Sequence, residues 1–242
     1  MNSSKSFDYE KIPDGYYDEI FHKKSGLQSA WHNLKFKMVS HKLKGLGKHL
    51  DLGCGPGTFI GNFQKFSSGV GIDLSQSQIE FARKKYGIQD NISFESCADG
   101  KIHFKEESFE QASMIEVIEH LDVDKSNQLL LEIFRVLKPS GQIVVTTPNY
   151  GSLWPVLEIL VNKTSKVSYE EQHIQKFKRK QLKLSLETAG YIKVKVKSFL
   201  FFAPFLAMLS WGLSKGFFKF ENSIGLNPIG FLLIATGEKP SG

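Results

Sequence analysis

The sequence predicts an α/β fold built on a largely parallel sheet. From residue 48 onward, short apolar runs typical of strands alternate with amphipathic segments typical of helices, and this alternation indicates βαβ units. A glycine-rich loop follows the first predicted strand, as in folds that bind nucleotides at the carboxyl end of a sheet. The 242 residues are enough for one large domain with a buried core.

The elements are expected in a regular order. After a polar entry, a helix is expected at 27–43. The next expected elements are a strand at 49–52, a helix at 59–66, a strand at 69–73, a helix at 76–86 and a weak strand at 92–95.

The second half repeats this pattern. A strand at 111–115 leads into the turn that carries Glu116 to His120, and an amphipathic helix at 125–137 is expected to stop at the KPSG turn, 138–141. The remaining expected elements are a strand at 142–147, a helix at 153–161, a basic helix at 179–189 and strands at 191–197 and 230–236.

No repeat or flexible linker divides the chain, so one domain spanning 1–242 is expected. Its parts are a cap region (1–47), a core (48–200), an apolar insert (201–227) and a last strand with a tail (228–242). The formal charge of +6 favours anionic partners, although a solvated lysine-rich surface explains it equally well. Two cysteines without metal-binding spacing, and an N-terminus without an apolar signal segment, predict a cytoplasmic setting.

Residues 198–214 contain no charged side chain. The stretch is shorter than the roughly 20 residues that a membrane-spanning helix needs, and Pro204 interrupts it. It also lies between two predicted strands of one sheet, which a spanning helix would separate. We therefore expect a hydrophobic lid or a surface lying on a membrane, or else packing in the core or in a dimer.

The most informative segment is HLDLGCGPGTF, residues 49–59. Gly53, Gly55 and Gly57 allow a tight turn and a close approach of the backbone to a ligand. Backbone N–H groups at the start of the next helix then face a carboxylate or phosphate. Dinucleotide-binding enzymes use G-x-G-x-x-G, whereas here the third glycine comes one residue earlier and Thr58 stands in its usual place.

With Asp51 before the loop, this segment resembles the first motif of class I S-adenosylmethionine-dependent methyltransferases. Further matches follow in order: Asp73 in GIDLS ends the second strand, and Asp99 follows the third. Residues 135–149 (RVLKPSGQIVVTTPN) resemble the family's helix, Pro-Gly turn and fifth strand, with Ser140 replacing a glycine. The resemblance covers roughly residues 45–200.

The resemblance implies a Rossmann-like sheet of seven mostly parallel strands with helices on both faces and an antiparallel last strand. It also implies that the cofactor is S-adenosylmethionine. The residues implied to bind this cofactor are Asp51, Gly53, Gly55, Gly57, Asp73, Leu74, Asp99 and Glu116. Singly, each aspartate is equally explained as a helix cap or turn residue; in register with the glycine loop, the three together favour the cofactor.

Glu116, Glu119 and His120 have i, i+3, i+4 spacing, which places them on one face of a helical turn. With His173, they resemble the divalent-cation site of small-RNA 2′-O-methyltransferases, and ubiquinone-biosynthesis O-methyltransferases share a similar Glu-x-x-Glu-His turn. That resemblance implies a metal held by all four residues, and this donor set suits Mn²⁺, Fe²⁺ or Zn²⁺ better than Mg²⁺. The alternative has no metal: Glu116 lines the cofactor pocket, and His120 acts as general base or caps a loop. The candidate catalytic residues are His120, Glu119 and His173.

The first acceptor hypothesis is a hydroxyl on an amphipathic small molecule, such as a quinone precursor, a lipid-linked sugar or a polyketide-like phenol. It rests on Trp154, on the apolar residues 199–213 and on the phenylalanines that follow them. Contact of 198–220 with the inner face of a membrane would bring flanking lysines to anionic headgroups. Five N-terminal residues either cover the acceptor or merely form a helix: Tyr16, Tyr17, Trp31, His32 and Lys35.

Two other functions remain open. An RNA-terminus 2′-O-methyltransferase would use a basic run for phosphate contacts. The run comprises Lys163, Lys166, Lys176, Lys178, Arg179, Lys180 and Lys183. No RNA-binding module is recognisable and the insert is apolar, so nucleic acid is the less favoured partner. A non-catalytic binding protein docked through 198–220 is the third reading, and the intact cofactor motifs argue against it.

Overall fold

The computed structural model describes residues 12–45, 47–97, 100–158, 173–223 and 229–241. Its strands are β1 (Lys48–Leu52), β2 (Ser68–Asp73), β3 (Ile92–Ser96), β4 (Phe109–Ile115), β5 (Leu137–Pro148), β6 (Ile192–Phe199) and β7 (Leu232–Glu238). They form one seven-stranded sheet in the order β3-β2-β1-β4-β5-β7-β6. Strand β7 runs antiparallel to β5 and β6, whereas the other pairings are parallel. The predicted Rossmann-like sheet is confirmed.

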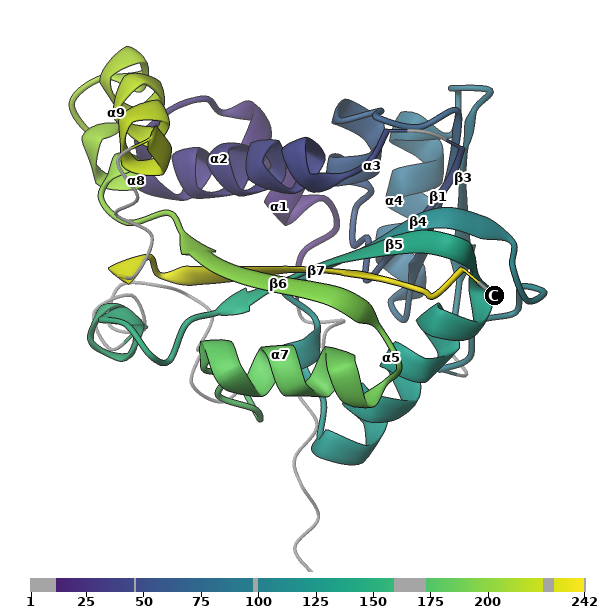
Figure 1. The fold of residues 1–242 in the computed structure, drawn as a ribbon. Coiled ribbons are helices and arrows are strands. Elements are labelled where there is room, and N and C mark those ends of the chain that lie inside the picture. Colours follow the sequence, from purple (N-terminus) through teal and green to yellow (C-terminus); the bar gives the residue numbers. More distant parts are fainter. Residues whose placement is uncertain (1–11, 46, 98–99, 159–172, 224–228, 242) are drawn as a thin grey trace, which may run out of the picture.

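Helices cover both faces of the sheet (Figure 1). On one face lie α1 (Tyr16–His22), α2 (Gly26–Lys42), α3 (Thr58–Asn62), α4 (Gln76–Tyr86), α8 (Ala203–Leu206) and α9 (Trp211–Ser223). On the other lie α5 (Val123–Val136) and α7 (Arg179–Thr188). This arrangement leaves the carboxyl ends of the parallel strands as the edge where a ligand can bind.

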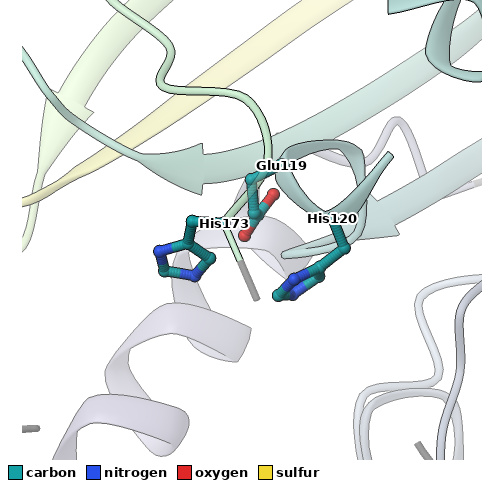
Figure 2. Close-up of side chains that lie close together, drawn as sticks. All are labelled: Glu119, His120 and His173. Carbon is teal, nitrogen blue, oxygen red and sulfur yellow. The ribbon is translucent and has the colours of Figure 1, made fainter. Parts of the chain in front are cut away.

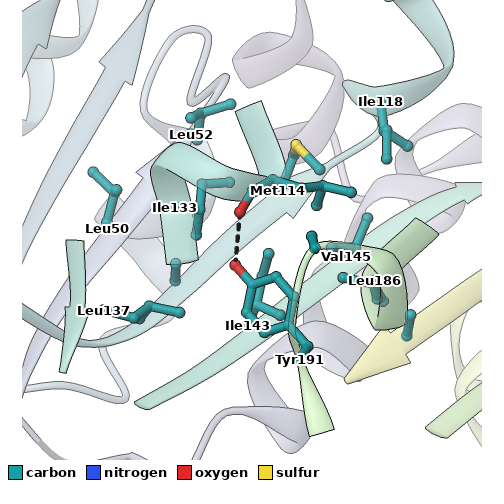
Figure 3. Close-up of a cluster of buried hydrophobic side chains, with 14 of the residues drawn as sticks. Leu50, Leu52, Met114, Ile118, Ile133, Leu137, Ile143, Val145, Leu186 and Tyr191 are labelled. Carbon is teal, nitrogen blue, oxygen red and sulfur yellow. Dashed lines mark hydrogen bonds between the residues drawn. The ribbon is translucent and has the colours of Figure 1, made fainter. Parts of the chain in front are cut away.

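The strand sequences explain why both faces are covered. In β5, Ile143 and Val145 belong to the core beneath α5 and α7, whereas Val144 belongs to the core beneath α2. Successive side chains of a strand point to opposite faces, so an uninterrupted apolar run requires helices on both. Figure 3 shows the α5/α7 core, in which the Tyr191 hydroxyl donates a hydrogen bond of 3.1 Å to the Leu130 carbonyl.

Two predicted boundaries are wrong by four residues or more. Helix α3 ends at Asn62, not at residue 66, because Phe63 packs beneath α2 while Phe66 packs in a separate cluster with α4. Strand β5 begins at Leu137, so the predicted turn at 138–141 lies within the strand. Ser140 has a φ of +61° and the pairing with β4 shifts register between Phe109 and Gln111, which indicates a bulge.

The apolar insert leaves the sheet at the end of β6 and returns to it at the start of β7, its neighbour. Helices α8 and α9 pack on each other and on α2. At the base of the insert Phe199 pairs with Leu232, and the Phe231 N–H donates to the Leu200 carbonyl at 3.0 Å. Of the helices in the described part of the chain, none is both long and apolar enough to cross a bilayer.

Candidate functional site

A cavity of about 1240 Å³ opens at the carboxyl ends of β1, β2, β4 and β5. Small-molecule sites usually enclose about 300–1,000 Å³, so this cavity has room for two ligands side by side. We call the part where the sequence leads us to expect S-adenosylmethionine the "cofactor half"; it is lined by Gly53, Gly55, Asp73, Leu74, Cys97 and Ile102. We call the opposite part the "acceptor half"; it is lined by Trp31, Lys35, Glu119, His120, Trp154, His173 and Phe205.

The three glycines of the loop differ in what surrounds them. All have positive φ, between +51° and +75°. A Cβ on Gly53 would lie 2.3 Å from a methyl carbon of Val117, and one on Gly57 would lie 2.7 Å from the ring of Phe94. A Cβ on Gly55 would meet no protein atom within 4 Å. Gly55 is therefore where the backbone borders open cavity, while Gly57, which does not line the cavity, permits the packing of α3.

Two of the predicted acids lie beside this loop. Asp73 accepts hydrogen bonds from the N–H of Gly55 at 2.7 Å and of Ser75 at 2.9 Å, so it fixes the loop to the end of β2. Asp51 is buried and accepts a hydrogen bond from the Ser113 hydroxyl. Burial raises the pKa of Asp51 to about 7. The third acid, Asp99, falls outside the described residues.

Glu116 follows β4 with a φ of +54°, and its carboxylate accepts a hydrogen bond from Lys35 of α2. The side chain of this lysine is only 3% exposed. A buried ammonium needs a paired charge, so this ion pair joins the cap region to the strand end. Glu116 therefore both pairs with Lys35 and lines the cavity.

Glu119, His120 and His173 converge in the acceptor half (Figure 2). Ligand atoms of the three lie within 4.8 Å of one another. Both carboxylate oxygens of Glu119 are buried, and among the described residues the Thr147 hydroxyl comes near them without the geometry of a full hydrogen bond. Burial, followed by the nearby charge of Glu116, raises the pKa of Glu119 to about 8. Three of the four predicted metal ligands thus form one group, and Glu116 is not a member of it.

Backbone contacts bring these distant segments together. Glu119 and His120 lie in a 3₁₀ turn, η2 (Ile118–His120), directly after β4. The Gln175 N–H donates to the Glu119 carbonyl at 2.9 Å, which holds the segment of His173 beside this turn. The Gln175 amide also donates to the Leu121 carbonyl at 2.8 Å.

Two residues behind His173 were missed by the sequence analysis. Glu158 Oε1 lies 2.6 Å from His173 Nδ1, and the Tyr150 hydroxyl lies 2.9 Å from the same nitrogen. Residues 154–158 are helical, as predicted for part of 153–161, and Glu158 is the single acid in the segment LWPVLEILV. An isolated acid in an apolar helix was the signal that could have identified it.

Three aromatic side chains, Trp31, Trp154 and Phe205, line the acceptor half, and Phe231 packs behind two of them. The ring of Trp31 lies 5.5 Å from that of Trp154 and 6.4 Å from that of Phe231, and Phe205 of α8 lies 6.2 Å from Phe231. Of the five N-terminal residues singled out in the sequence, Tyr17, Trp31, His32 and Lys35 line the cavity, and Tyr16 does not. Burial, together with the charge of Lys35, holds the pKa of His32 well below its usual value.

The insert also exposes several apolar side chains. We call the "insert surface" the set Phe202, Met208, Leu209, Leu213 and Phe220, each 47% to 79% exposed. In the basic run, Lys178, Lys180 and Lys183 are exposed on or next to α7, on the opposite side of the sheet from the insert. Lys163 and Lys166 fall outside the described residues.

Comparison with known proteins identifies the family. The sequence profile described as "Methyltransferase domain" matches residues 27–196. Over 120 residues the chain is 28% identical to a ubiquinone/menaquinone biosynthesis C-methyltransferase of Desulfotalea psychrophila, covering 47% of this chain and 48% of that protein. It is 35% identical over 99 residues to a sterol 24-C-methyltransferase of Debaryomyces hansenii, covering 39% of this chain and 26% of the relative.

A solved structure shows the same fold. The S-adenosylmethionine-dependent methyltransferase of Thermotoga maritima superposes with a TM-score of 0.68 at 20% identity, covering 92% of this chain and 94% of that one. The matches to the two curated relatives span about half of one and about a quarter of the other. The chain belongs to the methyltransferase domain family, and its fold is that of the Thermotoga maritima protein.

Proposed function

We propose that this enzyme transfers the methyl group of S-adenosylmethionine to a hydroxyl of an amphipathic small molecule or of a lipid-linked substrate. The observation that carries the proposal is the cavity itself, whose volume exceeds that of a single-ligand site. One half is bordered by the glycine loop and strand-end acids, and the other by aromatic rings and two histidines. Such walls suit a molecule with an apolar body and one reactive polar group.

In this proposal the cofactor half holds S-adenosylmethionine. Gly53 and Gly55 let the loop backbone approach the methionine portion, and Gly57 sets the start of α3. Asp73 accepts the ribose hydroxyls while Leu74 packs on the base. Asp51 and Glu116 face the positive charges of the cofactor, and Asp99 belongs to the adenine end.

In the acceptor half, either His120 or His173 deprotonates the acceptor. The Glu119 carboxyl group lies beside both imidazoles and sets the local charge. The oxygen of the acceptor attacks the methyl carbon in line with the sulfur. The carbon–sulfur bond breaks and its electron pair stays on sulfur, giving a methyl ether and S-adenosylhomocysteine. The protein contributes mainly by placing the two reactants and removing one proton.

The two curated relatives are named for quinone biosynthesis and for sterols, and both names specify transfer to carbon. Their names support an amphipathic acceptor for this chain. The two histidines are compatible with oxygen as the accepting atom, because a hydroxyl must lose a proton as it is methylated and imidazole is a suitable base near pH 7. Methylation of carbon also releases a proton, so analysis of the product decides between the two atoms.

The test is methyl transfer from S-adenosylmethionine carrying a ¹³C-labelled methyl group to a panel of acceptors. The panel contains octyl gallate, methyl gallate, a sterol and a short RNA, and the product is read by carbon NMR. We expect a methoxy signal from octyl gallate. A carbon-bound methyl group would overturn transfer to oxygen, label on RNA would favour the RNA function, and cofactor binding without transfer to any acceptor would favour the binding protein.

A divalent metal in the acceptor half is a second candidate feature, favoured by the buried oxygens of Glu119, which lack a full hydrogen bond within the described part of the chain. One carboxylate and two imidazoles fit Zn²⁺, Mn²⁺ or Fe²⁺. Glu119, His120 and His173 would hold the ion, and a bound ion would lower the pKa of an acceptor hydroxyl. The test measures the metal content of the purified chain and of Glu119→Gln by mass spectrometry. Equal content in the two proteins would exclude a metal bound at this site.

We also propose that the insert surface touches a membrane from one side. The insert exposes five apolar side chains, and α9 carries two of them, Leu213 and Phe220, together with Lys215 and Lys219. Basic residues beside an apolar surface favour anionic lipid. Sedimentation with vesicles containing phosphatidylglycerol should retain the wild-type chain and release Met208→Glu/Leu209→Glu. Equal sedimentation of the two would exclude this contact.

A further inference from the structure

The side chains behind His173 form a closed triangle of hydrogen bonds. Glu158 Oε1 lies 2.6 Å from His173 Nδ1 and 2.7 Å from the Tyr150 hydroxyl oxygen. That hydroxyl lies 2.9 Å from Nδ1. The side chains of His173 and Glu158 are 3% and 7% exposed, so water competes little for these contacts.

The donors and acceptors of this triangle determine where its protons are. An ionised carboxylate can only accept hydrogen bonds. The Tyr150 hydroxyl donates to Glu158 Oε1 at 2.7 Å. The remaining contact at Glu158 must come from Nδ1–H of His173. A neutral imidazole carries a single proton, so the lone pair is then on Nε2.

We propose that Glu158 and Tyr150 are positioning residues that hold His173 in the Nδ1–H tautomer, and that Nε2 of His173 is the atom that takes the acceptor's proton. The base role rests on the proposed function; the tautomer does not. As the acceptor oxygen bonds to the methyl carbon, its proton passes to Nε2 and the electron pair of the carbon–sulfur bond passes to sulfur. The resulting imidazolium is stabilised by Glu158 and releases its proton to water after the product leaves.

Carboxylate–imidazole pairs are a recurrent device for orienting a catalytic base. His173 is placed where it can reach a bound acceptor: it lines the cavity, and its ring centre lies 5.2 Å from that of His120. Glu158 does not line the cavity, so it acts on the acceptor only through His173. His120 is then left to contact the acceptor.

The first experiment needs no acceptor. Long-range proton–nitrogen NMR of the ¹⁵N-labelled chain, at pH 8 with chelator, distinguishes the two imidazole tautomers. The signal that His173→Gln removes should have the Nδ1–H pattern, and Glu158→Leu should convert it to a mixture of both tautomers. An Nε2–H or averaged pattern in the wild-type chain would overturn the proposal. Glu187→Leu, at an exposed ion pair of α7, is the control and should leave the pattern unchanged.

The second experiment measures turnover of octyl gallate. Loss of a group that orients an active-site histidine typically lowers activity by about 10–100-fold, so Glu158→Leu should reduce kcat by that factor and leave the cofactor Kd within about twofold. In a His173→Ala background the same change should have no further effect, because the two residues act as a unit. Full additivity would show a merely structural role and overturn the positioning claim.

A milder variant keeps the test valid if Glu158→Leu fails to fold. Tyr150→Phe keeps the ring and removes one hydrogen bond, so it should retain the Nδ1–H tautomer and lower kcat by only a few fold. If the wild-type chain methylates no acceptor, the proposed function fails while the spectra still decide the tautomer. If turnover occurs but the tautomer is wrong, only the present inference fails.

Discussion

The two halves of the cavity are built in different ways. The cofactor half comes mostly from one continuous segment, residues 49–59, and the adjacent end of β2, and its key feature is backbone bordering open space at Gly55. The acceptor half brings together α2, the turn after β4, two stretches after β5 and α8, and it presents side chains. A site built from local backbone recurs across a family, whereas one assembled from distant side chains can change its ligand without changing the fold.

The largest effect should come from Gly55→Val, which breaks the cofactor half. The added side chain projects into open cavity and the positive φ strains it, so S-adenosylmethionine affinity should fall more than about 100-fold, or about 3 kcal/mol by calorimetry. Gly26→Val is the matched control, since Gly26 has a φ of +76° and equally open surroundings but does not line the cavity. Retained affinity in Gly55→Val would contradict the assignment of this half.

Phe205→Ala should affect the acceptor half alone. Removing an aromatic wall lowers kcat/KM for octyl gallate about tenfold, because apolar contact with the tail is lost. The value for methyl gallate, which lacks the tail, and the cofactor Kd should change less than about twofold. Phe220→Ala removes an exposed ring of the same insert and serves as control. Equal losses for both gallates would show that Phe205 does not meet the tail.

Cofactor affinity measured over a pH series tests the role of Asp51 in the cofactor half. The pKa of Asp51 is raised to about 7 by burial, so this carboxyl is largely neutral at pH 6 and largely ionised at pH 8. The ionised form attracts the cationic cofactor, so affinity should rise about fivefold over this interval. Asp51→Asn should bind with the same affinity at both pH values. A wild-type affinity that falls with pH would contradict this account.

The smallest effect should leave both halves untouched. Ser140 adopts a φ of +61°, where glycine is the favoured residue. Ser140→Gly should raise the free energy of unfolding by about 0.5–1 kcal/mol without changing turnover. Ser93→Gly, at an exposed position in the middle of β3, should lower it by a similar amount. Chemical denaturation of both variants tests this separation of scaffold from site.

Sequence reasoning succeeded where the cause was local. The loop with Gly53, Gly55 and Gly57, the alternating strands and helices between residues 48 and 148, and the antiparallel last strand all follow from short-range pattern or family resemblance, and all are present. Helices α1, α8 and α9 were not predicted. The helix predicted at 76–86 has those bounds in α4, because Ser75 accepts from the Gln78 N–H as its cap and Gly87 follows its last residue.

It failed where the cause was tertiary. Nothing near Glu116 in the chain shows that Lys35 reaches its carboxylate, and nothing near His173 shows Tyr150 and Glu158 behind it. Helix α3 is shorter than predicted because Phe63 and Phe66 enter different cores. Contacts of this kind depend on how whole elements pack, which periodicity along the chain does not record.

The closed base of the insert has a consequence for how such enzymes diversify. Because β6 and β7 are antiparallel neighbours, the chain leaves the sheet at Phe199 and returns at Leu232 directly opposite. A loop whose ends already meet can be exchanged, lengthened or shortened with little loss of chain entropy. The insert that carries Phe205 on α8 can therefore be exchanged as a unit. Grafting the corresponding stretch of a relative between Phe199 and Leu232 offers a route to chimaeras that accept new substrates and keep the same cofactor-binding scaffold.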